Sequence, residues 1–411
     1  MASNQTQIAI VGGGIAGLAT AILLHRRGIR CQVFERSMEL KAVGAGIQLS
    51  PNGVRVLQGM GLGPALARTA VRAGAVEIRR WNDGSLISRT PHGARCEAVF
   101  GAPYQLMHRA DLQRCLVEAT PPDTLRAGRE CVRLVERPDA VELHFADGSV
   151  STADLVVGAD GVHSAVRGAV VTDEPRFSGY SVHRALVPAA SVPSFAEDPR
   201  VVFWFGPGRH VTYYPVSGGG IVHFSAVGRA EDGRPGSGGA QAEIGQLTAA
   251  FADWHPELRR VIGAAASVTR WDLFDRDLAA RYGSGRVVLV GDAAHPMLPY
   301  LSQGANQALE DSLVLADLLA GHAPARFPQA VRRYQELRHP RTAEVHAGSR
   351  NRATAFHLAD GPEQRERDAA LQRSQDVRQL AWLYGYRADT AAAAARPPAR
   401  QHSTGEPAPI G

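Results

Sequence analysis

Short apolar runs that end in glycine stand out at the start of the chain. Residues 8–11 are all apolar and lead into Gly12-x-Gly14-x-x-Gly17, after which small and aliphatic residues continue toward Gly28. A short apolar run bounded by glycines predicts a buried strand, and the longer segment predicts a helix that stops at Gly28. The mainly apolar residues 31–34 predict a second strand. The chain is therefore predicted to begin as strand, helix, strand.

The glycine spacing and one carboxylate indicate what this unit binds. Gly12 permits a tight turn, Gly14 lets the backbone approach a pyrophosphate, and Gly17 lets the helix pack close to the strand. The helix N-terminus offers free N–H groups and a positive dipole end to phosphates. Glu35 follows Gly17 by 18 residues, where an acidic residue is expected to bind a ribose hydroxyl. Together these features predict a dinucleotide site on a Rossmann-type fold.

Two later predicted strands end in acidic turns. Residues 155–159 precede Asp160-Gly161, and residues 286–290 precede Gly291-Asp292. Open α/β sheets bind ligands at the carboxyl ends of their strands. Asp292 either caps a turn or contacts a cofactor. The small-residue loop after it, which leads to a helix that begins after Gly304, favours the cofactor.

Alternating polar and apolar positions predict antiparallel strands in two regions. Residues 71–106 contain short strands at 75–81 and 85–88, which we expect to be inserted in the nucleotide domain. Residues 201–227 predict a meander of strands and turns. On its middle strand His210, Thr212 and Tyr214 share one face, because successive side chains point to opposite sides of a sheet. We expect this sheet to cover a ligand pocket.

Helical patterns fill much of the remaining chain. Helices are predicted from about Pro51 to Met60, from about Met107 to Ala119, at 242–254, at 256–263 and after Gly304. Near the end we expect helices at 329–339, after a break at Pro340 to about 358, and at 364–383. Residues 232–240 are predicted to be a flexible loop, and residues 390–411 a disordered tail without chemistry.

Two polar side chains near the predicted nucleotide site have two interpretations each. Gln48 lies in the glycine-rich segment 44–52 and is either a substrate contact or a hydrogen-bonded loop residue. Arg109, near the start of a helix, either contacts the cofactor or pairs with an acid such as Asp111. Their positions in the sequence do not decide between these roles.

The length and composition fit a globular protein of two closely packed domains. The chain has 411 residues, of which 45% are hydrophobic. No apolar run approaches the roughly 18 residues that span a membrane. The first six residues lack the basic and cleavage patterns of a signal peptide. We therefore expect a cytoplasmic protein that does not act at a membrane.

The cysteines and the charge exclude several other classes. Cys31, Cys96, Cys115 and Cys131 are scattered, so we interpret them as structural thiols and expect neither a metal site nor a disulfide framework. The net charge is +5, Lys41 is the only lysine, and the arginines are spread along the chain. This distribution argues against a nucleic-acid partner and allows a mild attraction for anionic substrates.

The glycine fingerprint at 12–17, Asp160-Gly161 and Gly291-Asp292 stand in an order that resembles the FAD-dependent aromatic hydroxylases, the single-component flavoprotein monooxygenases. The resemblance extends from Gly12 to about Tyr386. Residues 46–52, 296–307 and 382–386 look most like the branch acting on hydroxybenzoates and hydroxynicotinates, which includes 3-hydroxybenzoate 6-hydroxylase and salicylate hydroxylase-like enzymes. The implied fold is α/β, with a Rossmann-type FAD-binding domain interleaved with a mixed-sheet substrate domain and followed by a C-terminal helical region.

This resemblance implies a division of the chain into five segments. Residues 1–170 are the first part of the FAD-binding domain, with the inserted strands at about 71–106. Residues 171–280 are the substrate domain with its antiparallel sheet, and residues 281–325 return to the FAD-binding domain. Residues 326–389 are C-terminal helices, and residues 390–411 are the tail.

The resemblance also implies roles at the cofactor. The fingerprint glycines hold the FAD pyrophosphate, Glu35 the adenosine ribose and Asp292 the ribityl chain. Arg109 reaches the phosphate and ribityl region, and Val132 touches the adenine side through its backbone. The residues implied to bind cofactor are Gly12, Gly14, Ile15, Ala16, Gly17, Glu35, Arg36, Arg109, Val132, Asp160, Gly161, Asp292, Gly304, Ala305 and Asn306. Asp160-Gly161 is also linked to NAD(P)H, which is implied to bind transiently because the chain has no second glycine fingerprint.

On the substrate side, His210 and Tyr214 match the pocket histidine and tyrosine of the branch and are implied to be catalytic. Gln48, Tyr104 and Pro299 are the implied substrate contacts. The branch often has a glutamine before the aromatic residue of the last loop, whereas here Pro299 precedes Tyr300. The substrate of the branch therefore cannot be assigned to this chain. A lone strand histidine is more often structural, but an ordinary pKa near 6.5 would suit a base that takes a phenol proton.

The implied activity is that of an FAD-dependent monooxygenase that uses NAD(P)H and O2. It would hydroxylate a phenolic or hydroxybenzoate-like substrate through a C4a-hydroperoxyflavin. One alternative is epoxidation or dearomatising oxidation of a larger natural-product scaffold. Another is a redox sensor that carries FAD without turnover. The substrate, the choice between NADH and NADPH, and the choice between monomer and homodimer stay open.

Overall fold

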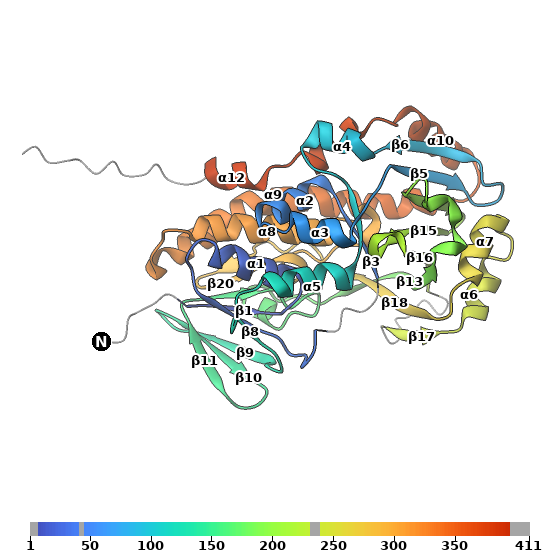
Figure 1. The fold of residues 1–411 in the computed structure, drawn as a ribbon. Helices are drawn as coiled ribbons and strands as arrows, with labels where there is room; N and C mark the ends of the chain where they lie inside the picture. Colours follow the sequence, from blue (N-terminus) through green and yellow to red (C-terminus); the bar gives the residue numbers. More distant parts are fainter. Residues whose placement is uncertain (1–6, 41–44, 231–238, 395–411) are drawn as a thin grey trace, which may run out of the picture.

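The computed structural model describes residues 7–40, 45–230 and 239–394. Six strands form a sheet in the order β19-β20-β12-β1-β2-β8, and β1 pairs in parallel with both β12 and β2. These strands are β1 (Ile8–Val11), β2 (Cys31–Phe34), β8 (Leu125–Arg126), β12 (Leu155–Gly158), β19 (Gly283–Ser284) and β20 (Val287–Leu289). The segments predicted as parallel strands therefore lie in one sheet (Figure 1).

Two helices share a core with this sheet. Helix α1 (Ile15–His25) packs against α8 (Gly304–Leu319), and Thr20 Oγ1 lies 3.0 Å from Ser312 Oγ between them. Ile10 of β1 and Leu309 of α8 are buried in the same cluster. The N-termini of both helices, which follow the glycine loop and the Gly291-Asp292 turn, reach one cavity.

A larger sheet of eight strands lies beside the first (Figure 1). Its order is β17-β18-β13-β16-β15-β14-β5-β6. The strands are β5 (Ala75–Arg80), β6 (Leu86–Pro91), β13 (Arg176–Pro188), β14 (Arg200–Gly206), β15 (Arg209–Val216), β16 (Ile221–Arg229), β17 (Ala240–Ala242) and β18 (Val268–Asp275). The predicted meander is β14, β15 and β16, which pair antiparallel in sequence order.

The prediction that strands at 71–106 belong to the nucleotide domain is wrong for β5 and β6. They form the predicted hairpin, but β5 pairs in parallel with β14 and so extends the large sheet. Glu77 of β5 is buried, and Arg200 of β14 lies 3.1 Å from its carboxylate. This ion pair and the parallel register hold a sequence-distant hairpin on the sheet.

Two small sheets and several short helices complete the described chain. One sheet has the order β3-β7-β4, with β3 (Gly46–Leu49), β4 (Val71–Arg72) and β7 (Gln105–His108). The other contains β9 (Cys131–Glu136), β10 (Val141–Phe145) and β11 (Val150–Ala153). The helices are α2 (Pro51–Gly59), α3 (Gly63–Thr69), α4 (Gly93–Phe100), α5 (Arg109–Ala119), α6 (Ile244–Ala250) and α7 (Pro256–Gly263).

The C-terminal region differs from prediction at Pro340. Helix α9 (Phe327–Phe356) continues through this proline without a break. A proline inside a helix loses one backbone hydrogen bond and costs about 3 kcal/mol. The buried side chain of Arg338 offsets this cost, because it bonds to Glu310 at 2.6 Å and to Asp311 at 2.7 Å on α8. After the proline, Arg341 donates to the carbonyls of Trp382 and Leu383 at 2.6 and 2.7 Å. Tertiary bonds on both sides of the proline therefore keep α9 whole.

After α9 the chain forms α10 (Pro362–Arg373), α11 (Ala381–Tyr384) and α12 (Ala388–Ala394). The single helix predicted at 364–383 is thus two shorter ones. The predicted tail begins too early, since residues 390–394 belong to α12 and Ala392 is buried. Residues 395–411, and most of the loop predicted at 232–240, lie outside the described residues.

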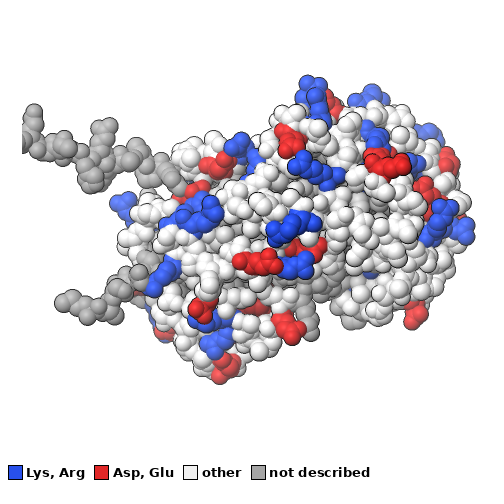
Figure 2. All heavy atoms as spheres, in the orientation of Figure 1, with Lys and Arg blue, Asp and Glu red and all other residues white. Residues whose placement is uncertain are grey.

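Charge and hydropathy at the surface agree with the composition. Acidic and basic side chains are interspersed over the face drawn in Figure 2. In the part of the chain that the structure describes, no helix is long and apolar enough to cross a membrane.

Candidate active site

A cavity of about 660 Å³ opens where the six-stranded sheet meets the large sheet. From the first sheet it is lined by the glycine loop, the ends of β2 and β12, and the N-terminus of α8. From the large sheet it is lined by side chains of β13, β14, β15 and β16. The cavity therefore joins the two elements that the sequence assigned to cofactor and to substrate.

The glycine loop has the geometry of a phosphate cradle. Gly12, Gly14, Ile15 and Ala16 line the cavity. A Cβ placed on Gly14 would meet no atom within 4 Å, so this backbone is open to a ligand. Gly17 instead faces inward, because its Cβ would lie 1.9 Å from the carbonyl oxygen of Gly12. Gly17 thus permits close packing of helix on strand, as predicted, but does not itself line the cavity.

The residues predicted for the adenosine end lie at one end of the cavity. Glu35 and Arg36 line the cavity, and a Glu35 carboxylate oxygen accepts the N–H of Gly13 at 2.7 Å. Residues 129–131 line the cavity next to Val132, whose side chain is 53% exposed, so the implied contact of Val132 through its backbone stays a prediction. Successive strand residues point to opposite faces, which places Cys131 inward and Val132 outward.

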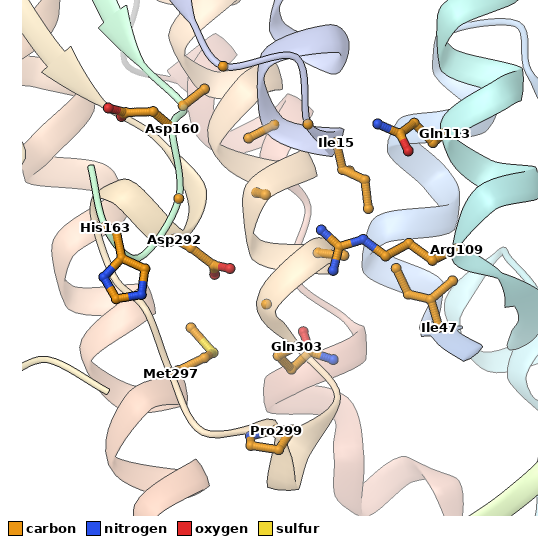
Figure 3. Close-up of a pocket in the computed structure, with 18 of the residues that line it drawn as sticks. Ile15, Ile47, Arg109, Gln113, Asp160, His163, Asp292, Met297, Pro299 and Gln303 are labelled. Atoms are coloured by element: carbon orange, nitrogen blue, oxygen red, sulfur yellow. The ribbon is translucent and has the colours of Figure 1, made fainter. Parts of the chain in front are cut away.

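Arg109 and Asp292 point into the middle of the cavity from opposite sides (Figure 3). Gly304 and Ala305, at the N-terminus of α8, also line it. Asn306 does not. Its amide donates to the carbonyl oxygens of Gln48 and Ser302 and accepts the N–H of Ser50, so the side chain is engaged within the protein and a cofactor contact of Asn306 stays a prediction.

Asp160 and Gly161 line the cavity, but the Asp160 carboxylate points away from it (Figure 3). The carboxylate accepts the hydroxyl of Ser164 at 2.5 Å and the backbone N–H of Ala165 at 2.7 Å. Asp160 therefore shapes the turn after β12, and its backbone rather than its charge faces the cavity.

A buried ionic network supports the turn that carries Asp292. The Asp311 carboxylate accepts the N–H of Gly291 at 2.8 Å, and it lies 2.6 Å from His295 and 2.7 Å from Arg338. Burial opposes ionisation of Asp311, but His295 and Arg338 outweigh it and hold the pKa of the carboxyl below its ordinary value. Arg167 donates to the carbonyls of Ala293 and Ala294, each at 2.8 Å. These buried hydrogen bonds and ion pairs thus hold the turn that carries Asp292 in place.

The large sheet presents one face to the cavity. His210, Thr212 and Tyr214 of β15 all line it, as the alternation predicted. Cross-strand pairs place Val227 beside His210, Ser225 beside Thr212 and His223 beside Tyr214. Val182 and Arg184 of β13 continue the rows of Val227 and Ser225. This face is apolar and aromatic except for a few polar groups, which is typical of a site for a small organic ligand.

His210 is paired with a second histidine. Its Nδ1 lies 2.8 Å from Nε2 of His357, just beyond α9, and the two rings stack at 5.0 Å. Burial, and then the His357 imidazole, hold the pKa of His210 well below its ordinary value. The expectation of an unperturbed pKa near 6.5 is therefore wrong. His210 is neutral at pH 7, so one of its ring nitrogens is available as an acceptor.

The predicted substrate contacts divide into two groups. Gln48 and Pro299 line the cavity. Tyr104 does not, since it lies behind Gln48 and donates its hydroxyl to the Gln48 side chain at 2.6 Å. Tyr300 lines the cavity as well, and its buried hydroxyl has no hydrogen-bond partner among the described residues. Tyr104 thus orients Gln48 from behind the wall, and its direct contact with substrate stays a prediction.

Arg184 is a charged wall residue that the sequence did not reveal. It lies on β13, where no motif marks it, and a strand arginine is more often at the surface. The periodicity of 176–188 could have paired it with Val182 on one face, but the face that meets the cavity depends on pairing with β16.

No metal centre is formed by the described residues, because no group of three or more histidine, cysteine or acidic side chains gathers there. Cys31, Cys96, Cys115 and Cys131 are all buried, free thiols. In contrast, the open backbone at Gly14, the carboxylate at Glu35 and the helix N-terminus at Gly304 fit the phosphates, ribose and flavin of FAD.

Comparison with known proteins decides the identity. The family model described as FAD binding domain matches residues 5–349. The chain belongs to this family. The 3-amino-4-hydroxybenzoate 2-monooxygenase of Streptomyces cremeus is 60% identical over 94% of this chain and 96% of its own length. The 3-hydroxybenzoate 6-hydroxylase of Klebsiella oxytoca is 34% identical over 92% of this chain and 96% of its own.

A solved structure agrees with the sequence relatives. A salicylate hydroxylase in complex with substrate has a TM-score of 0.81 and 27% identity, and the match covers 97% of this chain and all of the other. The protein is therefore an enzyme of the FAD-dependent aromatic hydroxylases, as the resemblance implied, with the mixed α/β fold expected of them.

Proposed function

We propose that this hydroxylase uses NAD(P)H and O2 to hydroxylate a small aromatic acid, and that 3-amino-4-hydroxybenzoate is the first compound to test. The relative that acts on this compound shares 60% of its residues with the chain. The observation that carries the proposal is the single cavity, in which the glycine loop and the wall of His210 and Tyr214 face the same space.

Within this proposal the six-stranded sheet and α8 form the FAD-binding part, and the large sheet forms the substrate part. Glu35 would hold the adenosine ribose, and Arg109 and Asp292 the phosphate and ribityl region. The positive end of the α8 dipole, at Gly304, would stabilise negative charge on the flavin ring. Bound FAD would supply electron transfer from NAD(P)H and the activation of O2. We keep the choice between the two nicotinamide cofactors for measurement.

The wall of the cavity would position the ring and accept a proton. Electron-donating substituents activate the ring carbons ortho and para to them. Carbon 2 of 3-amino-4-hydroxybenzoate is ortho to the amino group and meta to the hydroxyl, so the amino group is the donor there. His210, neutral and within the wall, would accept a proton from the ring substituent as oxygen is transferred. Tyr214, whose pKa burial raises, would stay protonated and donate a hydrogen bond.

The test is consumption of NAD(P)H and O2 by the purified FAD-loaded enzyme. The panel should hold 3-amino-4-hydroxybenzoate, 3-hydroxybenzoate, salicylate and 6-hydroxynicotinate, with NADH and NADPH compared. We expect an aromatic acid to accelerate NAD(P)H oxidation and to gain one oxygen atom by mass. An enzyme that holds FAD but oxidises NAD(P)H equally fast with and without every acid of the panel would contradict the proposal.

A further inference from the structure

The wall of the cavity that comes from the large sheet carries one formal charge. Its lining residues are Val182, Arg184, Phe203, His210, Thr212, Tyr214, His223, Ser225 and Val227. Burial, followed by the positive charge of Arg184, lowers the pKa of His223 to about 3, and His210 is neutral as well. Arg184 is thus the cation of this wall, and it stands in the row of Ser225 and Thr212, between the rows of His210 and Tyr214.

Among the residues that the structure describes, Arg184 has no acidic partner. No ion pair joins its guanidinium to a carboxylate within the described ranges, and the charged group that acts on it is Arg109, which repels it. Burial lowers the pKa of Arg184 most, Tyr214 raises it and Arg109 lowers it, yet a guanidinium stays protonated in proteins. Arg184 is half-buried in the cavity wall, and a partly desolvated cation without a counter-ion is costly. The wall is therefore incomplete until an anion enters the cavity.

We propose that Arg184 is the binding site for the carboxylate of the aromatic substrate. A guanidinium presents two parallel N–H donors that match the two oxygens of a carboxylate. Ser225 and Thr212, in the same row, add hydroxyl groups beside it. With its carboxylate at Arg184, a benzoate-sized ring lies along the wall, within reach of the row of His210 or that of Tyr214 and His223.

The glycine-loop side of the cavity has charges of its own. Glu35, Arg36, Arg109 and Asp292 line it from the six-stranded sheet, its helices and its loops. Arg109 thus serves the cofactor, while Arg184 comes from the other sheet. The proposal names the substrate class of the function proposed above and rests on it.

The test compares an acid with its neutral analogue in two enzymes. The substrates are 3-amino-4-hydroxybenzoate and 3-amino-4-hydroxybenzamide, and the enzymes are wild type and Arg184→Met, both loaded with FAD. We expect Arg184→Met to lower kcat/KM for the acid by about 100-fold and for the amide by less than about threefold. Arg184→Lys keeps the charge but not the two parallel N–H donors. Its kcat/KM for the acid should lie between those of wild type and Arg184→Met. The matched control is Arg260→Met, because Arg260 is an exposed arginine on α7. It should leave kcat/KM unchanged for both substrates.

An equal loss of kcat/KM for acid and amide in Arg184→Met would overturn the proposal. So would an unchanged kcat/KM for the acid, or a loss of bound FAD. A binding measurement distinguishes failure of the carboxylate site from failure of the proposed function. Titration of the oxidised enzyme with 4-hydroxybenzoate, followed by the flavin spectrum, needs neither NAD(P)H nor turnover. If no acid is hydroxylated but 4-hydroxybenzoate binds about 100-fold more weakly to Arg184→Met, the function fails and the carboxylate site stands. Equal binding to both enzymes would overturn the carboxylate site.

Discussion

His210 Nδ1 and His357 Nε2 lie 2.8 Å apart in the wall of the cavity, so one imidazole fixes the proton position on the other. The ring of Tyr180 stacks on His357 at 4.8 Å, and Tyr300 lies edge-on to it at 5.7 Å. Burial, and then the charge of Arg229, lower the pKa of His357 to about 4. Both histidines are neutral at pH 7, and the bond between them holds a single shared proton.

The first prediction concerns the pH dependence of stability. The folded pKa of His357 lies below that of the unfolded chain, near 6.5, so the unfolded state binds more protons between pH 6.5 and 4. Stability should therefore fall as pH drops through this window. His357→Phe keeps the stacking surface but cannot titrate, and its melting temperature should fall less between pH 7.5 and 5. If the melting temperatures of wild type and His357→Phe change with pH in parallel, His357 is not the group that titrates.

His357→Phe should also slow hydroxylation, because the tautomer of His210 is no longer fixed. His357→Gln retains a side-chain amide that is able to bond to His210. We expect kcat to fall about tenfold or more in His357→Phe and to recover in part in His357→Gln, with FAD content unchanged in both. The measurement is the rate of product formation at saturating substrate. Equal values for wild type and His357→Phe would remove the histidine pair from the reaction.

The second prediction concerns the network beneath the Asp292 turn. Asp311→Asn removes the charge that faces Arg338 and His295 while keeping an acceptor for the Gly291 N–H. Loss of one member of a buried ion pair costs about 3–5 kcal/mol, and we expect that loss together with faster release of FAD. Urea unfolding and the fluorescence of released flavin measure the two effects.

The matched control for that network is an exposed pair on α9. Glu336→Gln breaks the ion pair with Arg333, whose charged atoms lie 2.6 Å apart at the surface. It should change the free energy of unfolding by less than about 1 kcal/mol and leave FAD in place. Similar losses in Asp311→Asn and Glu336→Gln would show that burial does not determine the effect.

The sequence predicted the local features of this site and missed those set by distant pairing. The glycine loop follows from a short motif, and the shared face of His210 and Tyr214 follows from strand alternation alone. The wall position of Arg184 depends on its pairing with Ser225 of β16, which lies 41 residues further along the chain. The sequence also did not show that the Asn306 side chain turns toward β3, because each helix residue turns by about 100°.

The third prediction separates Tyr104 from Gln48. Tyr104→Phe removes the 2.6 Å hydrogen bond to Gln48 but leaves the cavity wall intact. We expect a loss of about 1 kcal/mol in stability and less than a threefold change in KM. Gln48→Leu changes the wall itself and should raise KM more. If Tyr104→Phe raises KM more than Gln48→Leu does, the tyrosine reaches the substrate directly and its placement behind Gln48 is wrong.

The fourth prediction uses two glycines of one motif that have different surroundings. A methyl group on Gly14 enters open space at the cradle, and its backbone angles suit alanine. Gly14→Ala should therefore fold normally and bind FAD at least about tenfold more weakly, since the methyl group occupies the approach to the pyrophosphate. A methyl group on Gly17 would lie 1.9 Å from the Gly12 carbonyl oxygen. Gly17→Ala should therefore lose about 1–3 kcal/mol or more of stability, because α1 must move away from β1.

Gly59→Ala in α2 is the control for both variants, since a methyl group there meets no atom within 4 Å. It should gain up to about 1 kcal/mol from helix propensity and keep its FAD. Circular dichroism and flavin binding by equilibrium dialysis distinguish the three variants. If Gly14→Ala unfolds or Gly17→Ala folds with full stability, the division between a glycine for the ligand and a glycine for packing is wrong. If Gly14→Ala binds FAD as tightly as wild type, the pyrophosphate does not approach this residue and the cradle must be placed elsewhere along the loop.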